Sequence, residues 1–562
     1  MRRFLNKYII LIIVLAAFLR LWKLDVVPPH LTQDEAALGY NAFSILKTAR
    51  DEHGEFLPVV FKSFGDYKPG LYVYLTVPFV ALLGLNEWSV RLSSALAGVL
   101  AVWVLHLIFM KLKREKSLPE DLHLEIIAPL LLTINPWHIQ FSRGAWEANV
   151  SLTLTLIGIL FFLKSFNNAR NVLLSVLAFS LTLIAYQGAK LSTLIVVASL
   201  AFVYKNQCLT IIRNSKLIIA ASIIVGLLIV SPIIYGANNG QLGRLKVFSV
   251  LSYPRQKQYL QDFLNQGNER IGSVSYYLYH TEINNFSRGI IGRWFNAFSG
   301  KYLFFDGDYQ NPRHSPPHQG MMLLVDIILL PVGMVALIRR KGRFNKLILL
   351  WLILAPLPAV LSRDQVQAVR SLNMSIPLVI VSSFGLGTIL KYIRNIKQKM
   401  VIIPSFLVLA LLIFTSLVFY FDSYYIHLPK DQSEDWGYGY KQAFEFLKNR
   451  GLGNRDIYVG QSYSQPYIFY LFFNQYDPSN YQKQSKIVEG DNKYDVGFIE
   501  KIDSVHFIEI KWQELQNNIG AIIVATDAEF PHVDLVNNKR VKILEEIRYL
   551  DSKPAYRIIE VL

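Results

Sequence analysis

The chain has 562 residues and a net charge of +16, from 57 Lys and Arg against 41 Asp and Glu. Hydrophobic residues make up 52% and charged residues only 17%, and the mean hydropathy is +0.30. Soluble domains carry about 25% charged residues, so the composition argues against an ordinary soluble enzyme, and its hydrophobicity excludes a disordered chain. The single cysteine, Cys208, excludes an intrachain disulfide and a cysteine-based metal site.

Apolar stretches dominate the first three quarters of the chain. A membrane-spanning helix needs about 20 mainly apolar residues. Candidate spans are 8–22, 89–110, 124–141, 148–163, 171–187, 191–204, 217–235, 320–338, 347–362, 371–390 and 401–421. We therefore predict an α-helical polytopic membrane protein with about eleven transmembrane helices.

A further apolar stretch, 71–85, contains Pro78 and decides the orientation of everything after it. Cytoplasmic loops are enriched in Lys and Arg. If the N-terminus is cytoplasmic and 71–85 does not cross, four basic clusters fall inside the cell: 111–116, 205–216, 339–346 and 391–399. The short outer loops then hold only Arg143, Lys190, Arg363 and Arg370. We therefore expect 71–85 to be a re-entrant or interfacial helix on the outer side.

This orientation leaves three segments outside the membrane: 23–88, 237–318 and the tail from 422. The first 22 residues have the basic start and apolar stretch of a signal peptide, but no cleavage site of small residues follows, so we expect an uncleaved first span.

The tail alternates helical stretches such as 438–450 with short strand-like runs at Ile457–Val459, Val505–Ile510, Ala521–Ala525 and Tyr556–Val561. This pattern predicts a small extracytoplasmic α/β domain over 422–562, after a catalytic transmembrane domain over 1–421.

Two adjacent carboxylates, Asp34 and Glu35, open an expected helix over 34–49 in the first outer loop. Thr32 and Glu35 fit a helix capping box, which is a structural explanation for Glu35. It explains Asp34 less well. A carboxylate at the membrane boundary is a candidate general base, since local desolvation would raise its pKa toward the working range.

Lys68 precedes the apolar 71–85 segment in the sequence Gly65-Asp66-Tyr67-Lys68-Pro69-Gly70. A Lys at headgroup depth is often only an interface anchor. The functional alternative is an ammonium group that pairs with a lipid phosphate.

Further polar residues stand near the outer ends of later spans. Arg143 and Glu147 form either part of a polar cavity with His138 or a simple ion pair four residues apart. Arg370 lies in a basic outer loop that breaks the inside bias, which favours function. The loop before the eighth span carries Asp306, Asp308 and His314, which suggest a divalent metal only weakly, because Asp-Gly is also a common turn.

The N-terminal third resembles the GT-C membrane glycosyltransferases, specifically family 39, which contains the protein O-mannosyltransferases and the lipid A aminoarabinose transferases. The matching features are Asp34-Glu35 after the first span, the Gly54 to Pro58 stretch, Lys68-Pro69 with Leu71, and Asn86-Glu87 followed by Arg91-Leu92. The likeness covers residues 1–190 well and the remaining spans in outline.

The resemblance implies an inverting transfer of a hexose or pentose from a polyprenyl phosphate to an acceptor hydroxyl. It implies that Asp34 deprotonates the acceptor and that Lys68 stabilises the lipid phosphate, with Glu35 as a further catalytic candidate. The aminoarabinose transferases have an acid directly before Lys-Pro, where this chain has Tyr67, so Asp66 is the candidate substitute.

The remaining candidates are assigned by position. Arg143 or Arg370 would help to neutralise the phosphate, in which case no metal is required. Possible substrate-binding residues are Tyr40, Tyr67, His138, Asp306, Asp308 and His314.

Two other functions stay open. A flippase or transporter for lipid-linked sugars would need charges within the spans and internal repeats. A metal-dependent, oligosaccharyltransferase-like enzyme would use Asp306 and Asp308 as ligands. The expected partners are the lipid-linked donor, a protein, lipid or glycan acceptor and membrane lipids, in a bacterial or archaeal cell membrane. Nucleic acid is not expected, because the basic residues are spread over the cytoplasmic loops.

Overall fold

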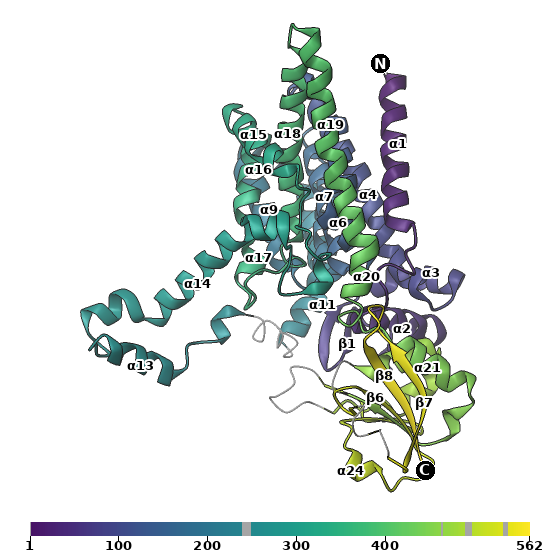
Figure 1. The fold of residues 1–562 in the computed structure, drawn as a ribbon. Coiled ribbons are helices and arrows are strands. Elements are labelled where there is room, and N and C mark those ends of the chain that lie inside the picture. The colour runs from purple at the N-terminus through teal and green to yellow at the C-terminus, as the bar shows by residue number, and fades with distance from the viewer. Residues whose placement is uncertain (1, 239–248, 462–464, 489–496, 532–534, 536–537) are drawn as a thin grey trace.

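The computed structural model describes residues 2–238, 249–461, 465–488, 497–531, 535 and 538–562. Part of the expected outer segment, 239–248, therefore lies outside the described residues. Long helices form a bundle, and a smaller body of strands and short helices lies at one end of it (Figure 1). The N-terminus lies at the opposite end of the bundle, and the C-terminus lies within the smaller body.

Each expected span coincides with helical structure. The bundle helices before the long outer loop are α1 (Arg2–Leu21), α4 (Glu87–Arg114), α5 (Leu124–Ile134), α6 (Pro136–Arg143), α7 (Glu147–Ser165), α8 (Asn171–Ala185), α9 (Ala189–Val203), α10 (Lys205–Asn214) and α11 (Lys216–Asn238). Those after it are α15 (Asp326–Arg339), α16 (Arg343–Leu354), α17 (Leu357–Val360), α18 (Ser375–Arg394) and α19 (Lys399–Asp422).

Six helices of the described chain are long and apolar enough to cross a membrane, or seven if the bent pair α9 and α10 is one span. Four of the six are α4, α7, α11 and α18, and the others are the continuous stretches Arg343–Val360 and Met400–Asp431. The number eleven therefore stays a prediction.

Two expected spans are not straight helices. The stretch 124–141 divides into α5 and α6 because Asn135 has an extended backbone, and its side chain accepts a hydrogen bond from the His138 amide at 2.9 Å. Pro136 then occupies the first helical position, where its missing N–H costs nothing. The second break bends α9 against α10 by 86°.

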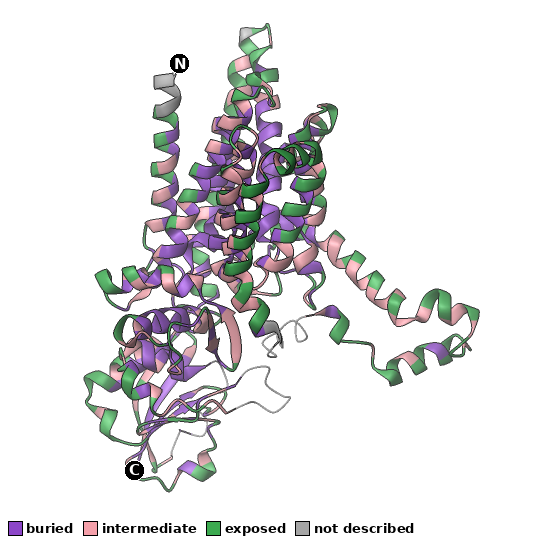
Figure 2. Ribbon diagram, turned by 180° about the vertical axis from the view of Figure 1, so that it is seen from behind, coloured by how far each residue is buried: buried purple, intermediate pink, exposed green. Residues whose placement is uncertain are grey.

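The least buried long helices are the most apolar. Only 11% of the α11 window and 6% of the α19 window are buried inside the protein, although their mean hydropathies are 2.8 and 2.7. Apolar helices exposed in this way fit contact with lipid acyl chains. Figure 2 shows the corresponding exposed strips along the bundle.

Helices α15 and α18 cross at glycines. A Cβ atom on Gly333 would lie 1.9 Å from the Val381 carbonyl oxygen, and one on Gly385 would lie 2.0 Å from the Leu329 carbonyl oxygen. Small residues let membrane helices approach this closely and gain van der Waals contact.

The segment expected to be the first outer loop folds against the end of the bundle. It contains α2 (Gln33–Thr48), the hairpin of β1 (Val60–Ser63) and β2 (Asp66–Pro69), and α3 (Leu71–Leu83). Helix α3 is the expected 71–85 helix. Its 13 residues are too few for a straight span, and it lies across the bundle end near α2 (Figure 1).

The tail contains a six-stranded mixed sheet in the order β4-β5-β3-β6-β8-β7. Strands β5, β3 and β6 are parallel, and the pairs β4–β5, β6–β8 and β7–β8 are antiparallel. The strands are β3 (Ile457–Gly460), β4 (Lys501–Ile502), β5 (Val505–Ile508), β6 (Ile522–Thr526), β7 (Val541–Arg548) and β8 (Pro554–Val561). The tail helices are α20 (Leu428–Asp431), α21 (Tyr440–Asn449), α22 (Pro466–Phe473), α23 (Pro478–Gln482) and α24 (Trp512–Leu515).

The tail shares a hydrophobic core with the first outer loop. One cluster of buried residues joins Leu31, Ala36 and Tyr40 of the loop to Tyr440 and Phe469 of the tail. A separate cluster fills the bundle. The division at residue 422 therefore cuts through a continuous core, and a separate tail domain stays a prediction.

The α15–α18 crossing is testable by adding one methyl group. We expect Gly333→Ala to lower the stability by about 1–3 kcal/mol, because the new Cβ must push the two backbones apart. The matched control is Gly292→Ala, where nothing lies within 4 Å of the added Cβ. Thermal unfolding of the purified protein in detergent measures both, and equal midpoints would contradict the close crossing.

Candidate active site

The start of α2 positions two acids. The Thr32 hydroxyl accepts a hydrogen bond from the Glu35 amide at 3.2 Å, and the Glu35 carboxylate accepts one from the Thr32 amide at 2.9 Å. This confirms the capping box. Asp34, the residue just before Glu35, therefore lies in the first turn of α2.

The β1–β2 hairpin positions Lys68. Its two turn residues, Phe64 and Gly65, have φ angles of 55° and 77°, and positive φ at both positions suits a two-residue hairpin turn. The Phe64 ring centre lies 5.0 Å from the Lys68 Nζ and also contacts the ring of Tyr467 in the tail. A ring from the hairpin turn thus lies against the Lys68 ammonium group.

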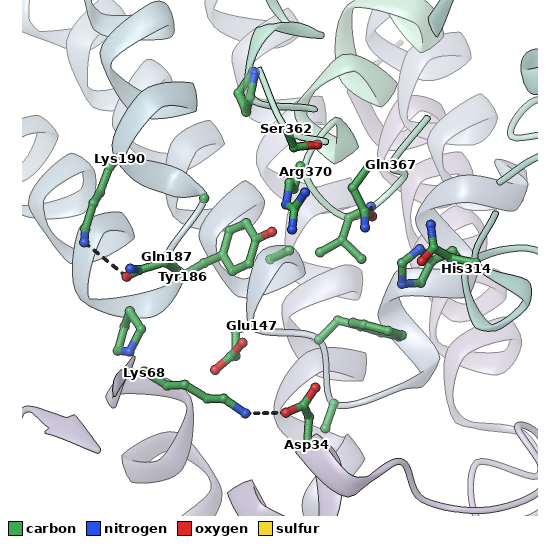
Figure 3. Close-up of a pocket in the computed structure, with 18 of the residues that line it drawn as sticks. Asp34, Lys68, Glu147, Tyr186, Gln187, Lys190, His314, Ser362, Gln367 and Arg370 are labelled. Carbon is green, nitrogen blue, oxygen red and sulfur yellow. Dashed lines mark hydrogen bonds and ion pairs between the residues drawn. The ribbon is translucent and has the colours of Figure 1, made fainter. Parts of the chain in front are cut away.

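Asp34 and Lys68 form a direct ion pair, in which Lys68 Nζ donates to Asp34 Oδ1 (Figure 3). The Lys68 side chain is 13% exposed, whereas the Asp34 side chain is 50% exposed. The desolvation expected for Asp34 is therefore absent. Its environment is set by an adjacent positive charge and by water.

Both residues line a cavity of about 580 Å³ at this end of the bundle. Its walls come from the start of α2, strand β2, the segment before and at the start of α7, the α8–α9 junction, the 311–314 turn and the loop after α17. The polar and charged lining residues are Thr32, Asp34, Glu35, Tyr67, Lys68, Glu147, Tyr186, Gln187, Lys190, Ser249, Asn311, Arg313, His314, Ser362, Gln367 and Arg370. Both signs of charge therefore face one space.

Glu35 is held by other protein groups. Its Oε1 accepts from Arg91 Nε at 3.0 Å and from the Ala145 amide at 2.8 Å, and its Oε2 accepts from the Thr32 amide. Both Glu35 and Arg91 are buried. These contacts indicate a structural role for Glu35 instead of the catalytic role that we expected.

Arg143 is not a lining residue of the cavity, in contrast to the sequence prediction. Its guanidinium group is fully buried and donates to the carbonyl oxygens of Leu19, Trp22, Lys23 and Val27 and to the Tyr424 hydroxyl. Carbonyl groups beyond the end of α1 have no helical partner. Arg143 satisfies them and fixes the exit of the first helix.

His138 and Tyr40 are also structural. The His138 ring is fully buried and bonds to the Arg20 guanidinium at 2.6 Å. The buried Tyr40 donates its hydroxyl proton to the Tyr476 carbonyl at 3.0 Å, which ties α2 to the tail. Neither residue lines the cavity, in contrast to the position expected for substrate-binding residues.

Arg370 does line the cavity, and its side chain points toward Tyr186 and Gln367 (Figure 3). It forms an ion pair with Asp364 at 3.0 Å and is 18% exposed. The loop after α17 therefore contributes a second cation, opposite the α2 and β2 wall.

The 302–318 loop separates its three candidates. His314 lines the cavity, and its Nδ1 lies 2.8 Å from Asp308 Oδ2. The buried Asp308 also accepts from the Ala368 amide and the Asn311 side chain, so it fastens this loop to the loop that carries Arg370. Asp306 is outside the cavity lining, with its side chain 45% exposed beside Lys301.

Tyr67 and Asp66 differ in their position relative to the cavity. Tyr67 lines the cavity next to Lys68, whereas Asp66 lies at the start of β2 opposite Ser63 and does not line it. The expected replacement of the missing acid by Asp66 is therefore not found at the cavity wall.

Sequence reasoning left Glu147 open between a cavity residue and an ion pair with Arg143, and it missed three other lining residues. Glu147 begins α7 and reaches into the cavity between Lys68 and Asp34, while Tyr186, Gln187 and Lys190 come from the α8–α9 junction (Figure 3). Lys190 donates to Gln187 Oε1 at 3.1 Å. The available signal was the position of Glu147 and Lys190 at the outer ends of predicted spans.

Behind the hairpin lies a buried acid, Glu52. Its Oε1 accepts hydrogen bonds from Asn41 at 3.1 Å and Ser63 at 3.0 Å. Desolvation by burial raises the pKa of Glu52 to about 7, and the nearby Lys68 and the hydrogen bonds oppose this rise. Glu52 is thus a titratable group that is bonded to the hairpin and lies close enough to interact electrostatically with Lys68.

No family model and no curated protein matches this chain. Solved structures do. ArnT from Cupriavidus metallidurans, bound to undecaprenyl phosphate, has a TM-score of 0.55 and 13% identity, over 99% of this chain and 98% of that chain. Its apo state has a TM-score of 0.53 at the same identity and coverage. The archaeal oligosaccharyltransferase AglB from Archaeoglobus fulgidus, in complex with an inhibitory peptide and a dolichol-phosphate, has a TM-score of 0.48 and 12% identity over 83% of this chain and 63% of that chain.

The chain therefore has the fold of ArnT over nearly its whole length, which confirms the GT-C fold predicted from the sequence. At 13% identity this likeness shows the fold alone.

The free energy of unfolding of two variants can distinguish a structural role of Glu35 from a catalytic one. We expect Glu35→Gln to lower the free energy of unfolding by about 3–5 kcal/mol, because it leaves the buried Arg91 charge without its counter-ion. Asp34→Asn breaks a half-exposed pair and should cost less than about 1 kcal/mol. Thermal unfolding compares the two variants. A Glu35→Gln protein as stable as the wild type would reject the structural assignment.

Glu52 predicts a pH dependence of stability. Its pKa is about 7 in the folded protein against a reference value of 4.5, so between these values the folded chain holds a proton that the unfolded chain has lost. Stability then falls as the pH rises through this window. Glu52→Gln cannot ionise. We therefore expect the midpoint of thermal unfolding of this variant to change less with pH than that of the wild type between about pH 5 and pH 8.

The matched control for this measurement is Glu55→Gln, an exposed acid of the same loop. It should keep the wild-type slope. A wild-type slope in Glu52→Gln would mean that this carboxyl does not titrate in the window.

Proposed function

We propose that this chain is an integral-membrane glycosyltransferase that moves a sugar from a polyprenyl phosphate to an acceptor hydroxyl, with inversion at the anomeric carbon. The observation that carries the proposal is the Asp34–Lys68 pair in the wall of one cavity at the end of the bundle. The ArnT fold, known with undecaprenyl phosphate bound, supports a lipid-phosphate donor. We further propose a cytoplasmic N-terminus, so that the cavity opens at the outer face.

In this proposal Lys68 and Arg370 bind the donor phosphate and Asp34 is the general base. The acceptor oxygen loses its proton to Asp34 and forms a bond to the anomeric carbon. The bond between that carbon and the phosphate oxygen breaks, and its electron pair leaves with the lipid phosphate. Cations preorganised around the phosphate stabilise this developing charge.

The reaction geometry requires the ion pair to open. An inverting attack places the nucleophile and the leaving phosphate on opposite faces of the sugar, so the base and the phosphate-binding cation must be separated by the sugar ring. Asp34 and Lys68 are in direct contact. We propose that the donor phosphate takes over Lys68, and that this exchange releases Asp34 to accept the proton.

We propose that no metal is required. The two acids that could have been ligands are used otherwise, since Asp308 binds His314 and the Ala368 amide and Asp306 faces Lys301 outside the cavity. In the described chain, no three His, Cys, Asp or Glu side chains lie together as a metal would need.

Glu147, which shares the cavity wall, is the second candidate for the base.

Asp34→Asn is the central test. With donor extracted from membranes and purified protein, we expect the rate of transfer to fall about 10²–10⁴-fold, the usual contribution of a general base. Binding of undecaprenyl phosphate should be as tight as in wild type or tighter, because Lys68 no longer has a competing carboxylate. Lys68→Gln should instead weaken that binding.

Asp306→Asn is the matched control and should keep the wild-type rate. Wild-type transfer by Asp34→Asn together with loss in Glu147→Gln would move the base to Glu147. Movement of lipid-linked sugar across proteoliposomes without any glycosyl product would replace the enzyme by a transporter. Loss of activity with a chelator, restored by Mg²⁺ or Mn²⁺, would contradict the metal-free mechanism.

The sugar itself can be identified directly. We expect a polyprenyl-phosphate monosaccharide to co-purify with the Asp34→Asn protein, because this variant should bind the donor without turning it over. Mass spectrometry of the extracted lipids would give the mass of the sugar. Recovery of only lipids without a phosphate-linked sugar would contradict the assigned donor class.

A further inference from the structure

A long outer segment, residues 249–298, projects sideways from the end of the bundle (Figures 1 and 2). We call it the arm. It contains α13 (Lys257–Gln266), a π-helical turn (Tyr276–His280) and α14 (Glu282–Ala297). Only a few of its side chains are buried, among them Val250, Leu264 and Ala297.

The arm has a defined shape of its own. Arg255 pairs with Glu282 at 3.1 Å, and His280 pairs with Glu269 at 3.1 Å, so that the chain before α13 and the turn after it are fastened to the start of α14. These two ion pairs join parts of the arm that are up to 27 residues apart in sequence.

Those apolar side chains form a stripe on α14. Ile283, Phe286, Ile290 and Trp294 recur at spacings of three, four and four residues, which places them on one helix face. Ile283 is 76% exposed, and Ile291, at the edge of the stripe, is 56% exposed. Further exposed large apolar residues of the arm are Leu251, Tyr253, Tyr259, Phe263, Ile271, Val274, Tyr277, Leu278 and Tyr279. So large an apolar surface needs a partner.

Both ends of the arm are attached at the outer end of the bundle. The Val250 amide donates to the Leu361 carbonyl at 3.0 Å, and the Trp294 indole donates to the Ile353 carbonyl at 2.9 Å. Leu361 is also a lining residue of the cavity. The arm therefore leaves the bundle beside the cavity.

The composition of the arm suits a lipid surface. Aromatic residues with a polar edge are enriched where a membrane meets water, and Tyr and Trp occur throughout the arm. Its charged residues are five basic and three acidic ones: Arg255, Lys257, Arg270, Arg288, Arg293, Asp262, Glu269 and Glu282. This excess of positive charge complements anionic headgroups.

We propose that the arm lies flat in the headgroup region of the outer leaflet, with the α14 stripe turned toward the acyl chains. It is then an interfacial element in addition to the spanning helices, and it enlarges the contact with the leaflet beside the cavity. An amphipathic helix in this position binds by its apolar area and by attraction to anionic lipids. This inference depends on the bundle crossing the membrane and is independent of the enzymatic activity.

Accessibility of spin labels tests the proposal. Cys208 is the single cysteine, so Cys208→Ser gives a background for one label at a time. Ile283→Cys and Ile290→Cys place labels on the stripe. Gly292→Cys and Arg288→Cys place matched labels on the exposed polar side, where the Cβ on Gly292 meets nothing within 4 Å.

The protein is reconstituted in nanodiscs of phosphatidylcholine and phosphatidylglycerol. We expect labels at 283 and 290 to collide several-fold more with lipid-soluble oxygen than with an aqueous nickel chelate, and labels at 288 and 292 to show the reverse. Equal access of nickel to all four labels would overturn the proposal. Dipolar coupling between labels on two molecules would replace the lipid by a second copy of the chain.

If Cys208→Ser does not fold, the four variants are made with Cys208 present, and the signal of the labelled wild type is subtracted. Proteins without phosphatidylglycerol in the nanodisc provide the charge control. The contrast between the two faces should shrink there if anionic headgroups hold the arm.

Discussion

The buried ion pair between Arg91 and Glu35 fixes the geometry on which the candidate site depends. Arg91 also donates to the carbonyl oxygens of Leu24, Pro28 and His30, so one guanidinium group orders the whole path from the first span to α2. Each buried polar group in this path would otherwise lack a partner, at a cost of about 1–3 kcal/mol. Because Glu35 is held in place, the residue before it must point its side chain into the cavity from a fixed position.

The tail supports the second half of the same site. The Gly497 amide donates to the Phe64 carbonyl at 2.7 Å, directly at the turn of the hairpin that carries Lys68. Gln482 donates to Ser44, Thr48 and the Asp51 carbonyl, next to the buried Glu52. The tail thus contributes to the position of Lys68 through packing, whatever else it binds. One of its two hydrophobic clusters continues into α2, and the other contains tail residues alone.

The sequence was informative where one physical rule acts locally. Apolar length predicted the helices, the Thr32–Glu35 spacing predicted the cap, and the position of Asp34 and Lys68 beside the first span predicted a shared outer surface. It was uninformative where a role depends on distant partners. Arg143, His138 and Tyr40 have the chemistry of site residues, but carbonyl groups of α1, the Arg20 side chain and the tail occupy them. Conversely, Tyr186 and Lys190 reach the cavity only because α8 and α9 meet there.

The exposure of Asp34 changes the physical account of how a base would work at this place. A desolvated acid keeps its proton affinity high at all times, whereas Asp34 is half exposed and held by an adjacent ammonium group. In the proposed mechanism, the basicity of Asp34 is then controlled by whether Lys68 pairs with Asp34 or with the donor phosphate, and not by desolvation. In this mechanism a lipid phosphate displaces the carboxylate from Lys68, so the base becomes available when the leaving group is already bound by its cation. In the same proposal a water molecule in the cavity would meet a paired carboxylate, and the proton acceptor is withheld until the donor arrives.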